Sequence, residues 1–184
     1  FVESPAYEAL PGLVRLLGGE LRTVPRRFES AYALPDDLPA RIEAERPAIV
    51  LLTNPHNPSG VHLDADELEV IARAATDVGS LLVIDEVYLE FLADVVARSA
   101  SRLKGNVAVV SSLTKAYGLG TLRFGWILAN EDIIERAIRY NDFVSVVYPN
   151  PSAHFGLAAL GQIEALSRRA QDVRAQNAPL VESW

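Results

Sequence analysis

The stretch "NVAVVSSLTKAYGLGTLRFGWILAN", residues 106–130, holds two apolar, strand-like runs separated only by a loop. Because no helix lies between the runs to make a parallel crossover, the second strand should run antiparallel to its neighbours or sit elsewhere in the sheet. The loop presents Lys115 among hydroxyls and glycines, and Arg123 stands where the chain enters the second run. Gly118 and Gly120 would let this loop turn back tightly. The stretch therefore predicts a strand–loop–strand unit that brings a lysine and an arginine to one edge of a sheet.

The rest of the chain alternates strand patterns with helix patterns. Compact apolar runs predict further strands at residues 20–25, 48–53 and 81–85. Apolar residues at helical spacing predict helices at residues 6–19, 34–45, 64–79, 131–141 and 151–176, the last bent near Gly161, and a less regular helix at 92–103. Such alternation is typical of an α/β fold. We expect a three-layer α/β/α sandwich around a mostly parallel, mixed sheet.

Composition excludes several classes of protein. The 184 residues carry a net charge of −7 with acids and bases mixed, which argues against nucleic acid and anionic membrane as partners. The sequence has no cysteine, so it forms no disulfide or thiolate metal site, and we expect a soluble, cytoplasmic protein. Its three histidines, His56, His62 and His154, are too far apart to suggest a metal site, so we expect none.

Polar side chains follow three of the predicted strands. Asn54 and Asn57 come after residues 48–53, Asp85 ends the run at 81–85, and Lys115 follows the predicted strand at 106–112. Open α/β sheets bind ligands outside the carboxyl ends of their strands. If the strands are parallel neighbours, one rim collects the residues Asn57, Asp85, Tyr88, Lys115 and Arg123.

Each of these residues has an ordinary alternative. A strand-end Asp85 can cap a turn, and "LLVIDE" (81–86) fits a Walker B strand, but the sequence lacks the Gly-x-x-x-x-Gly-Lys-Ser/Thr loop that such a nucleotide site needs. Lys115 could be a solvated surface charge, and Arg123 a strand-entry charge. In an enclosed site, however, a lysine becomes an amine nucleophile and an arginine binds phosphate. Together with a buried carboxylate, they suggest pyridoxal 5'-phosphate (PLP).

Four motifs in order carry a family resemblance: "SPAY" (4–7), "NPHNPSG" (54–60), "DEVYLEF" (85–91) and "SSLTKAYGLGTLRFGW" (111–126). With them, nearly the whole chain resembles the large domain of the fold-type I, class I/II PLP-dependent aminotransferases, in particular the histidinol-phosphate aminotransferase-like branch. The resemblance implies transfer of an amino group between an amino acid and a 2-oxo acid.

The resemblance also implies roles for single residues. Lys115 would form the Schiff base with PLP and shuttle the proton at the substrate α-carbon, and Asp85 would pair with the pyridine nitrogen. Asn57 and Tyr88 would hydrogen-bond the phenolic oxygen of PLP. The phosphate would be held by Ser112 and Arg123, with Thr114 as a further contact. Tyr7 would stack on the cofactor ring, the alternative being a core aromatic at a helix start.

Nearby residues are given structural roles. Glu86 is interpreted as a supporting or surface acid, and His56 as a turn residue. Tyr117 could line the site or pack the loop, and Asn57–Pro58 could be a cis peptide.

Parts of the family pattern are missing, and both ends of the chain suggest a fragment. We expect residues 1–150 to be a cofactor-binding large domain without its N-terminal part, and residues 151–184 to be a helix leading toward a small domain. The missing parts would include a phosphate-cradling turn, the arginine for the substrate carboxylate, and a tyrosine from the partner subunit of a homodimer.

Two alternatives to transamination stay open. The first is another PLP reaction on the same scaffold, such as that of a lyase, a decarboxylase or an oxidase-like enzyme, because such enzymes share the cofactor contacts. The second is an inactive fragment or binding domain that keeps only the fold.

Overall fold

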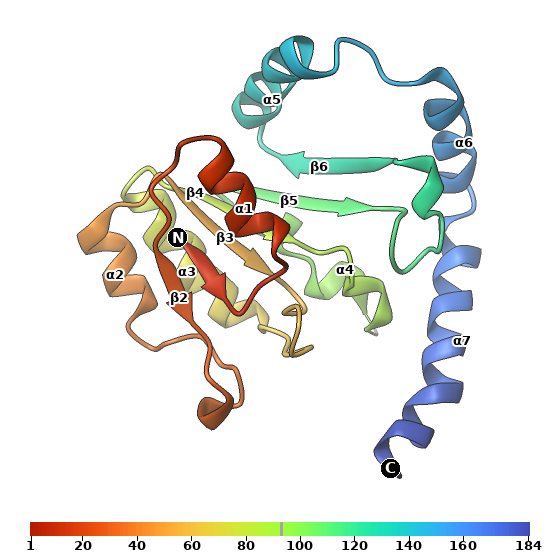
Figure 1. The fold of residues 1–184 in the computed structure, drawn as a ribbon, viewed down its shortest axis with the longest axis horizontal. Helices are drawn as coiled ribbons and strands as arrows, with labels where there is room; N and C mark the ends of the chain where they lie inside the picture. The colour runs from red at the N-terminus through yellow and green to blue at the C-terminus, as the bar shows by residue number, and fades with distance from the viewer. Residues whose placement is uncertain (93) are drawn as a thin grey trace.

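One mixed sheet forms the centre of the protein (Figure 1). The computed structural model describes residues 1–92 and 94–184. In these residues the strand order is β2-β1-β3-β4-β5-β6. The strands are β1 (Val2–Ser4), β2 (Thr23–Pro25), β3 (Ile49–Thr53), β4 (Leu81–Asp85), β5 (Val107–Ser112) and β6 (Gly125–Ala129). All neighbours are parallel except β5 and β6, which are antiparallel, as the absence of a helix between them predicts.

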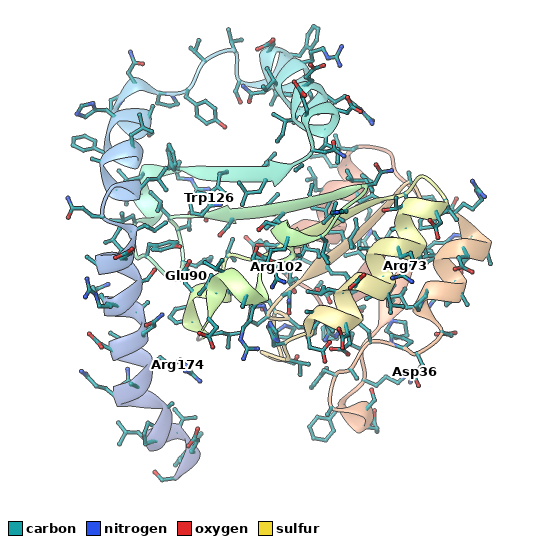
Figure 2. The ribbon with its side chains drawn as sticks, turned by 180° about the vertical axis from the view of Figure 1, so that it is seen from behind. Asp36, Arg73, Glu90, Arg102, Trp126 and Arg174 are labelled. Carbon is teal, nitrogen blue, oxygen red and sulfur yellow. The ribbon has the colours of Figure 1, made fainter. Side chains whose placement is uncertain are left out.

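Helices flank both faces of this sheet. The α-helices are α1 (Ala9–Leu16), α2 (Leu38–Glu45), α3 (Ala65–Asp77), α4 (Val95–Arg98), α5 (Glu131–Val144), α6 (Asn150–Leu160) and α7 (Ile163–Glu182). Short 3₁₀ turns are η1 (Phe28–Ser30), η2 (Leu89–Phe91), η3 (Ala100–Arg102) and η4 (Gly120–Leu122). Helix α1 lies in front of the sheet in Figure 1, whereas α3 and α4 lie in front in the reverse view of Figure 2. The expected α/β architecture is confirmed.

Helix α3 shows why these segments form where they do. The Asp64 carboxylate accepts hydrogen bonds from the N–H groups of Asp66 and Glu67, and the Glu67 side chain accepts one from the Asp64 N–H. This capping box satisfies donors that the first helical turn leaves unpaired. The expected apolar face is buried against β3 and β4, with members Leu68, Ile71, Ala72 and Ala75.

Three expectations about the elements need correction. Residues 151–176 do not form a single bent helix. The helix is interrupted at Gly161 and Gln162, which separate α6 from α7. The segment 92–103 is only partly helical, in α4 and η3, and position 93 lies outside the described residues. Strand β1 was not expected, since three residues are too few to show an alternating pattern.

The start of β6 approaches β5 closely at Gly125. A Cβ built on Gly125 would lie 2.9 Å from the carbonyl oxygen of Ser111 and 3.3 Å from Cβ of Ser112. Real Cβ atoms do not come so near a backbone oxygen, so any larger residue would push the two strands apart. Because Ser112 pairs with Gly125 in the ladder, this contact sets the geometry of the sheet edge.

We therefore expect Gly125→Ala to lower the free energy of unfolding by about 1–3 kcal/mol through overpacking. Urea denaturation would measure the loss. Gly12→Ala is the matched control, because Gly12 lies inside α1 with nothing within 4 Å of an added Cβ. That variant should be neutral or more stable by up to about 1 kcal/mol. Equal stability of the two variants would contradict the close approach at Gly125.

Candidate functional site

The carboxyl ends of β1, β3, β4 and β5 meet at one edge of the sheet, and antiparallel β6 begins there. Thr53 pairs with Asp85, Asp85 with Val110, and Ser112 with Gly125. The loops that carry every candidate site residue therefore leave the sheet on the same side. We call this edge the rim; its candidates are Tyr7, Asn57, Asp85, Tyr88, Ser112, Thr114, Lys115 and Arg123.

Asp85 is a half-buried acid at the centre of the rim. Its Oδ1 accepts a hydrogen bond from the Val87 N–H at 3.0 Å. Burial is the main cause that raises the pKa of Asp85, and the Glu3 charge raises it further, while Val87 and the Lys115 charge lower it. A carboxyl group in this setting is held ionised by a nearby cation or by hydrogen-bond donors.

Lys115 stands exposed on a loop whose backbone is closed by its own hydrogen bonds. The Leu119 N–H donates to the Leu113 carbonyl at 2.9 Å, and the Gly118 N–H donates to the Lys115 carbonyl at 3.0 Å. Gly118 has φ +72°, as the tight turn requires, but Gly120 lies in η4 without a positive φ. The amine is thus accessible while the backbone below it is fixed.

The second conformationally special position is Arg123 rather than Gly120. Arg123 has φ +51° and ends η4 in the left-handed region, directly before β6. Its Nη1 donates to the Gly120 carbonyl at 3.2 Å, and the side chain is exposed. Across the same loop, the Thr114 N–H donates to Oγ of Ser112 at 3.3 Å. Two hydroxyls and a guanidinium therefore stand near the ends of the β5–β6 connection.

The remaining candidates come from three other loops. The Asn57 N–H donates to Oγ1 of Thr53 at 2.9 Å, and Asn57–Pro58 is a cis peptide. Tyr88 is half-buried and stacks on Phe91 with ring centroids 6.5 Å apart. Tyr7 is 55% exposed, so the alternative of a core aromatic is wrong.

Sequence reasoning missed a buried charge network below the rim. Glu3 and Arg26 form an ion pair of 2.8 Å between Oε2 and Nη1, with both side chains fully buried. The other Glu3 oxygen, Oε1, accepts from the Thr53 N–H at 2.5 Å and from its hydroxyl at 2.6 Å. Because the Thr53 hydroxyl oxygen also accepts from Asn57, the pair fixes the turn that carries Asn57. The sequence signal that could have indicated this network is the charged residue Glu3 within "FVES" (1–4).

His56 joins two of the rim loops. Its Nε2 lies 2.9 Å from the Pro5 carbonyl oxygen and its Nδ1 lies 2.6 Å from Oγ of Ser59. A carbonyl only accepts, so Nε2 carries the proton and Nδ1 accepts from Ser59. Burial is the main cause that lowers the pKa of His56, which favours this neutral form. The ring thus holds the loop before Tyr7 against the turn 54–60.

Glu86, next to Asp85, has a separate structural task. It is buried, so the surface interpretation is wrong. Its Oε1 accepts from the Ala100 N–H at 2.6 Å and its Oε2 accepts from the Ser99 hydroxyl at 2.7 Å. These bonds hold the start of η3, and burial raises the pKa of Glu86.

In residues 1–92 and 94–184, no three His, Cys, Asp or Glu side chains are grouped as a metal site would need. Across the same described part of the chain, every helix is too short or too polar to cross a membrane.

Comparison with known proteins decides the family. The sequence profile described as "Aminotransferase class I and II" matches residues 1–183. The chain belongs to this family. A histidinol-phosphate aminotransferase of Rubrobacter xylanophilus is 35% identical over 138 residues, 73% of this chain and 38% of that relative. A capreomycidine synthase of Streptomyces vinaceus is 31% identical over 148 residues, 79% of this chain and 38% of the relative.

Solved structures agree on the fold. A PLP-dependent aminotransferase from Streptococcus suis has a TM-score of 0.83 at 23% identity, with 100% of this chain and 49% of that chain covered. The aspartate aminotransferase of Thermus thermophilus with maleate has a TM-score of 0.80 at 24% identity, with 99% and 49% covered. At this identity the likeness shows the aminotransferase fold alone. The chain spans about half the length of these structures, and less than half of the two relatives above.

The buried setting of Asp85 predicts how stability depends on pH. The unfolded chain ionises this acid near its ordinary pKa of 3.8, whereas the folded protein resists ionisation. Asp85 therefore costs stability as pH rises from that value through the folded-state pKa. In cofactor-free protein, we expect Asp85→Asn to raise the urea midpoint at pH 7, with the gain shrinking as pH falls toward 3.8.

Asp36→Asn is the control for this experiment, because Asp36 is an exposed acid just before α2 and is no member of the rim. Its midpoint should follow that of the unmodified protein at every pH. A D85N variant that is less stable at pH 7 would show that the carboxylate is already well compensated in the absence of ligand.

Proposed function

We propose that this chain is the cofactor-facing part of a PLP-dependent aminotransferase that moves an amino group between an amino acid and a 2-oxo acid. The observation that carries the proposal is the joint position of Asp85, Lys115 and Arg123 at one rim. An acid that needs a cation, an accessible amine and a guanidinium match the three polar ends of PLP. Family membership and the names of the relatives support the same activity.

The setting of Asp85 provides the test of fit. Its pKa is raised mainly by burial, and in the described structure its charge is only partly offset by Val87 and Lys115. A protonated pyridine nitrogen would supply the missing cation and keep the acid ionised. The residues present therefore fit PLP. Bound PLP supplies an aldehyde for the amine and an electron-withdrawing ring that eases loss of the substrate α-proton.

The rim residues then have distinct tasks. Lys115 would hold PLP when it is bound and, as a free amine, would move the proton at the substrate α-carbon. Asn57 and Tyr88 donate hydrogen bonds to the phenolic oxygen, and the exposed Tyr7 ring covers one face of the cofactor. The fixed Thr53–Asn57 bond and the His56 link orient the loops that carry Asn57 and Tyr7 before any ligand arrives.

The phosphate lies at the other end of the ring in this proposal. Ser112, Thr114 and Arg123 bind it, because a guanidinium forms paired, charge-assisted hydrogen bonds with phosphate oxygens. The left-handed backbone at Arg123 turns the side chain out at the entry to β6.

The proposal extends to the whole protein. Residues 1–150 belong to the large domain and residues 151–184 lead toward a small domain that holds the arginine for the substrate carboxylate. We propose a cytoplasmic homodimer in which the partner subunit completes the phosphate site, with no nucleic-acid or membrane partner. By itself, the 184-residue chain would then bind cofactor but transaminate poorly.

Lys115 and Lys104 are the two lysines of the sequence, which gives the first test its control. We expect borohydride reduction after addition of PLP to attach the cofactor to Lys115, as peptide mass spectrometry would show. Lys115→Ala should abolish the visible absorbance of bound cofactor and this label, whereas Lys104→Ala, which alters an exposed lysine, should keep both. Equal labelling of the two lysines, or none, would overturn the proposal.

The phosphate assignment has its own test. We expect Arg123→Gln to weaken PLP binding about 10- to 100-fold, the loss expected for a charge-assisted hydrogen bond, while binding of pyridoxal, which lacks the phosphate, stays unchanged. Fluorescence titration with both compounds measures the difference. Arg27→Gln, at an exposed arginine outside the rim, should bind PLP normally. A loss of affinity that is equal for PLP and pyridoxal would remove Arg123 from the phosphate site.

The match with a capreomycidine synthase keeps a second candidate, another PLP reaction on this scaffold. A half-reaction with an amino donor separates the two. Appearance of pyridoxamine phosphate and a 2-oxo acid supports transfer, and loss of carbon dioxide or of a side-chain group supports the alternative.

A further inference from the structure

Glu90 joins three separate parts of the protein. It lies in η2, and its Oε1 accepts a hydrogen bond from the Tyr117 hydroxyl at 2.6 Å. Its other oxygen, Oε2, accepts one from the Ser167 hydroxyl at 2.7 Å. Tyr117 belongs to the loop after β5, and Ser167 belongs to α7. Figure 2 shows Glu90 beside α7, between this helix and the centre of the sheet.

Tyr117 is the buried anchor of the loop that carries Lys115. Its side chain is only 3% exposed, although Lys115, two residues earlier, is exposed. The ring packs against Trp126 of β6 with centroids 6.3 Å apart. Burial first, and then Glu90, raise the pKa of Tyr117, so the phenol stays a protonated donor to the carboxylate. Tyr117 therefore holds the loop from below, together with the buried side chains of Leu113 and Ala116.

Helix α7 approaches the same loop at a second point. A Cβ on Gly118 would lie 3.2 Å from Nη1 of Arg169, one turn or less from Ser167 along the helix. The helix then continues away from the sheet to the C-terminus (Figure 1). Ser167 and Arg169 both lie in the first half of α7, so a shift of the helix would act on the loop through this region.

We propose that Glu90 is a positioning residue whose carboxylate fixes the Lys115 loop to α7, so that the position of α7 sets the position of the Lys115 amine. Hydrogen bonds to an ionised group are stronger than neutral ones, and here each carboxylate oxygen binds a donor from a different element. The relevance to catalysis rests on the proposed function of Lys115, but the mechanical link itself does not.

Hydrogen–deuterium exchange of the cofactor-free protein tests the link directly. Ser167→Ala removes one hydroxyl on α7 and leaves the Lys115 loop unchanged in sequence. We expect peptides covering residues 113–119 to exchange roughly three- to tenfold faster, as for a local opening that has lost one hydrogen bond. Ser183→Ala is the matched control: its hydroxyl donates to the Leu180 carbonyl within the end of α7, so the loop should be unaffected.

A double variant identifies the route. Tyr117→Phe keeps the ring against Trp126 but removes the donor to Glu90, so it should raise exchange of the loop by a similar factor. If Ser167 acts on the loop through Tyr117, by way of Glu90 or by its own contact with the Tyr117 hydroxyl, adding Ser167→Ala to Tyr117→Phe should not raise loop exchange further. Additive effects would assign the link to the Arg169 contact instead and overturn the role of Glu90. Thermal melting confirms that each variant is folded.

The rate at which Lys115 captures PLP tests whether the link through Glu90 affects the chemistry of the amine. We expect Ser167→Ala to slow borohydride-trapped capture of PLP on Lys115 by roughly the same three- to tenfold factor, with Ser183→Ala unchanged. Loop exchange that stays unchanged in Ser167→Ala overturns this inference even where Lys115 captures PLP normally. Failure of Lys115 to capture PLP in the unmodified protein would instead refute the proposed function and leave the exchange result intact.

Discussion

The rim depends on one buried carboxylate, that of Glu3. Strand β1 is three residues long and pairs along its whole length with β2, but it has a single registered pair with β3, so its backbone alone fixes it weakly to β3. A buried charge without a partner costs several kcal/mol. Arg26 on the β2 side and the Thr53 hydroxyl and N–H on the β3 side compensate this charge, and they thereby place β1 between its neighbours. The loop that bears Tyr7 and the turn that bears Asn57 both start from strands that Glu3 holds together.

Adjacent acids at the end of β4 show how position decides function. Burial raises the pKa of both Asp85 and Glu86. Glu86 turns to η3 and finds two donors there, the Ser99 hydroxyl and the Ala100 N–H, so its hydrogen-bonding capacity is used inside the protein. Asp85 turns to the rim, where Val87 supplies a donor and Lys115 a charge. A cationic ligand at the rim would compensate the charge of Asp85. This makes Asp85 a better candidate for a binding role than Glu86.

The local sequence pattern was sufficient to predict those parts of the fold that depend on residues close together in the sequence. The strands at 48–53, 81–85 and 107–112, the antiparallel β6 and the shared rim all follow from apolar runs, strand ends and the missing crossover helix. The sequence pattern could not predict which groups the buried polar side chains bind. Arg26 lies 23 residues from Glu3, and Ser167 lies 77 residues from Glu90, so each pairing exists only once the sheet has assembled. Sequence reasoning therefore located the candidate residues of the rim and missed those that hold them.

The loop that carries Lys115 has to meet two demands at once. A reactive amine has to be exposed, yet an exposed loop is normally mobile. Here the fixed points lie on either side of the lysine: the Leu113 N–H donates to the Phe124 carbonyl at 3.0 Å, and Tyr117 is buried on Glu90. Since the first point belongs to the β5–β6 ladder and the second reaches α7, the sheet determines where the loop begins and ends, while the helix determines how it lies between. Any movement of α7 would consequently reach the Lys115 loop through Glu90 and Tyr117.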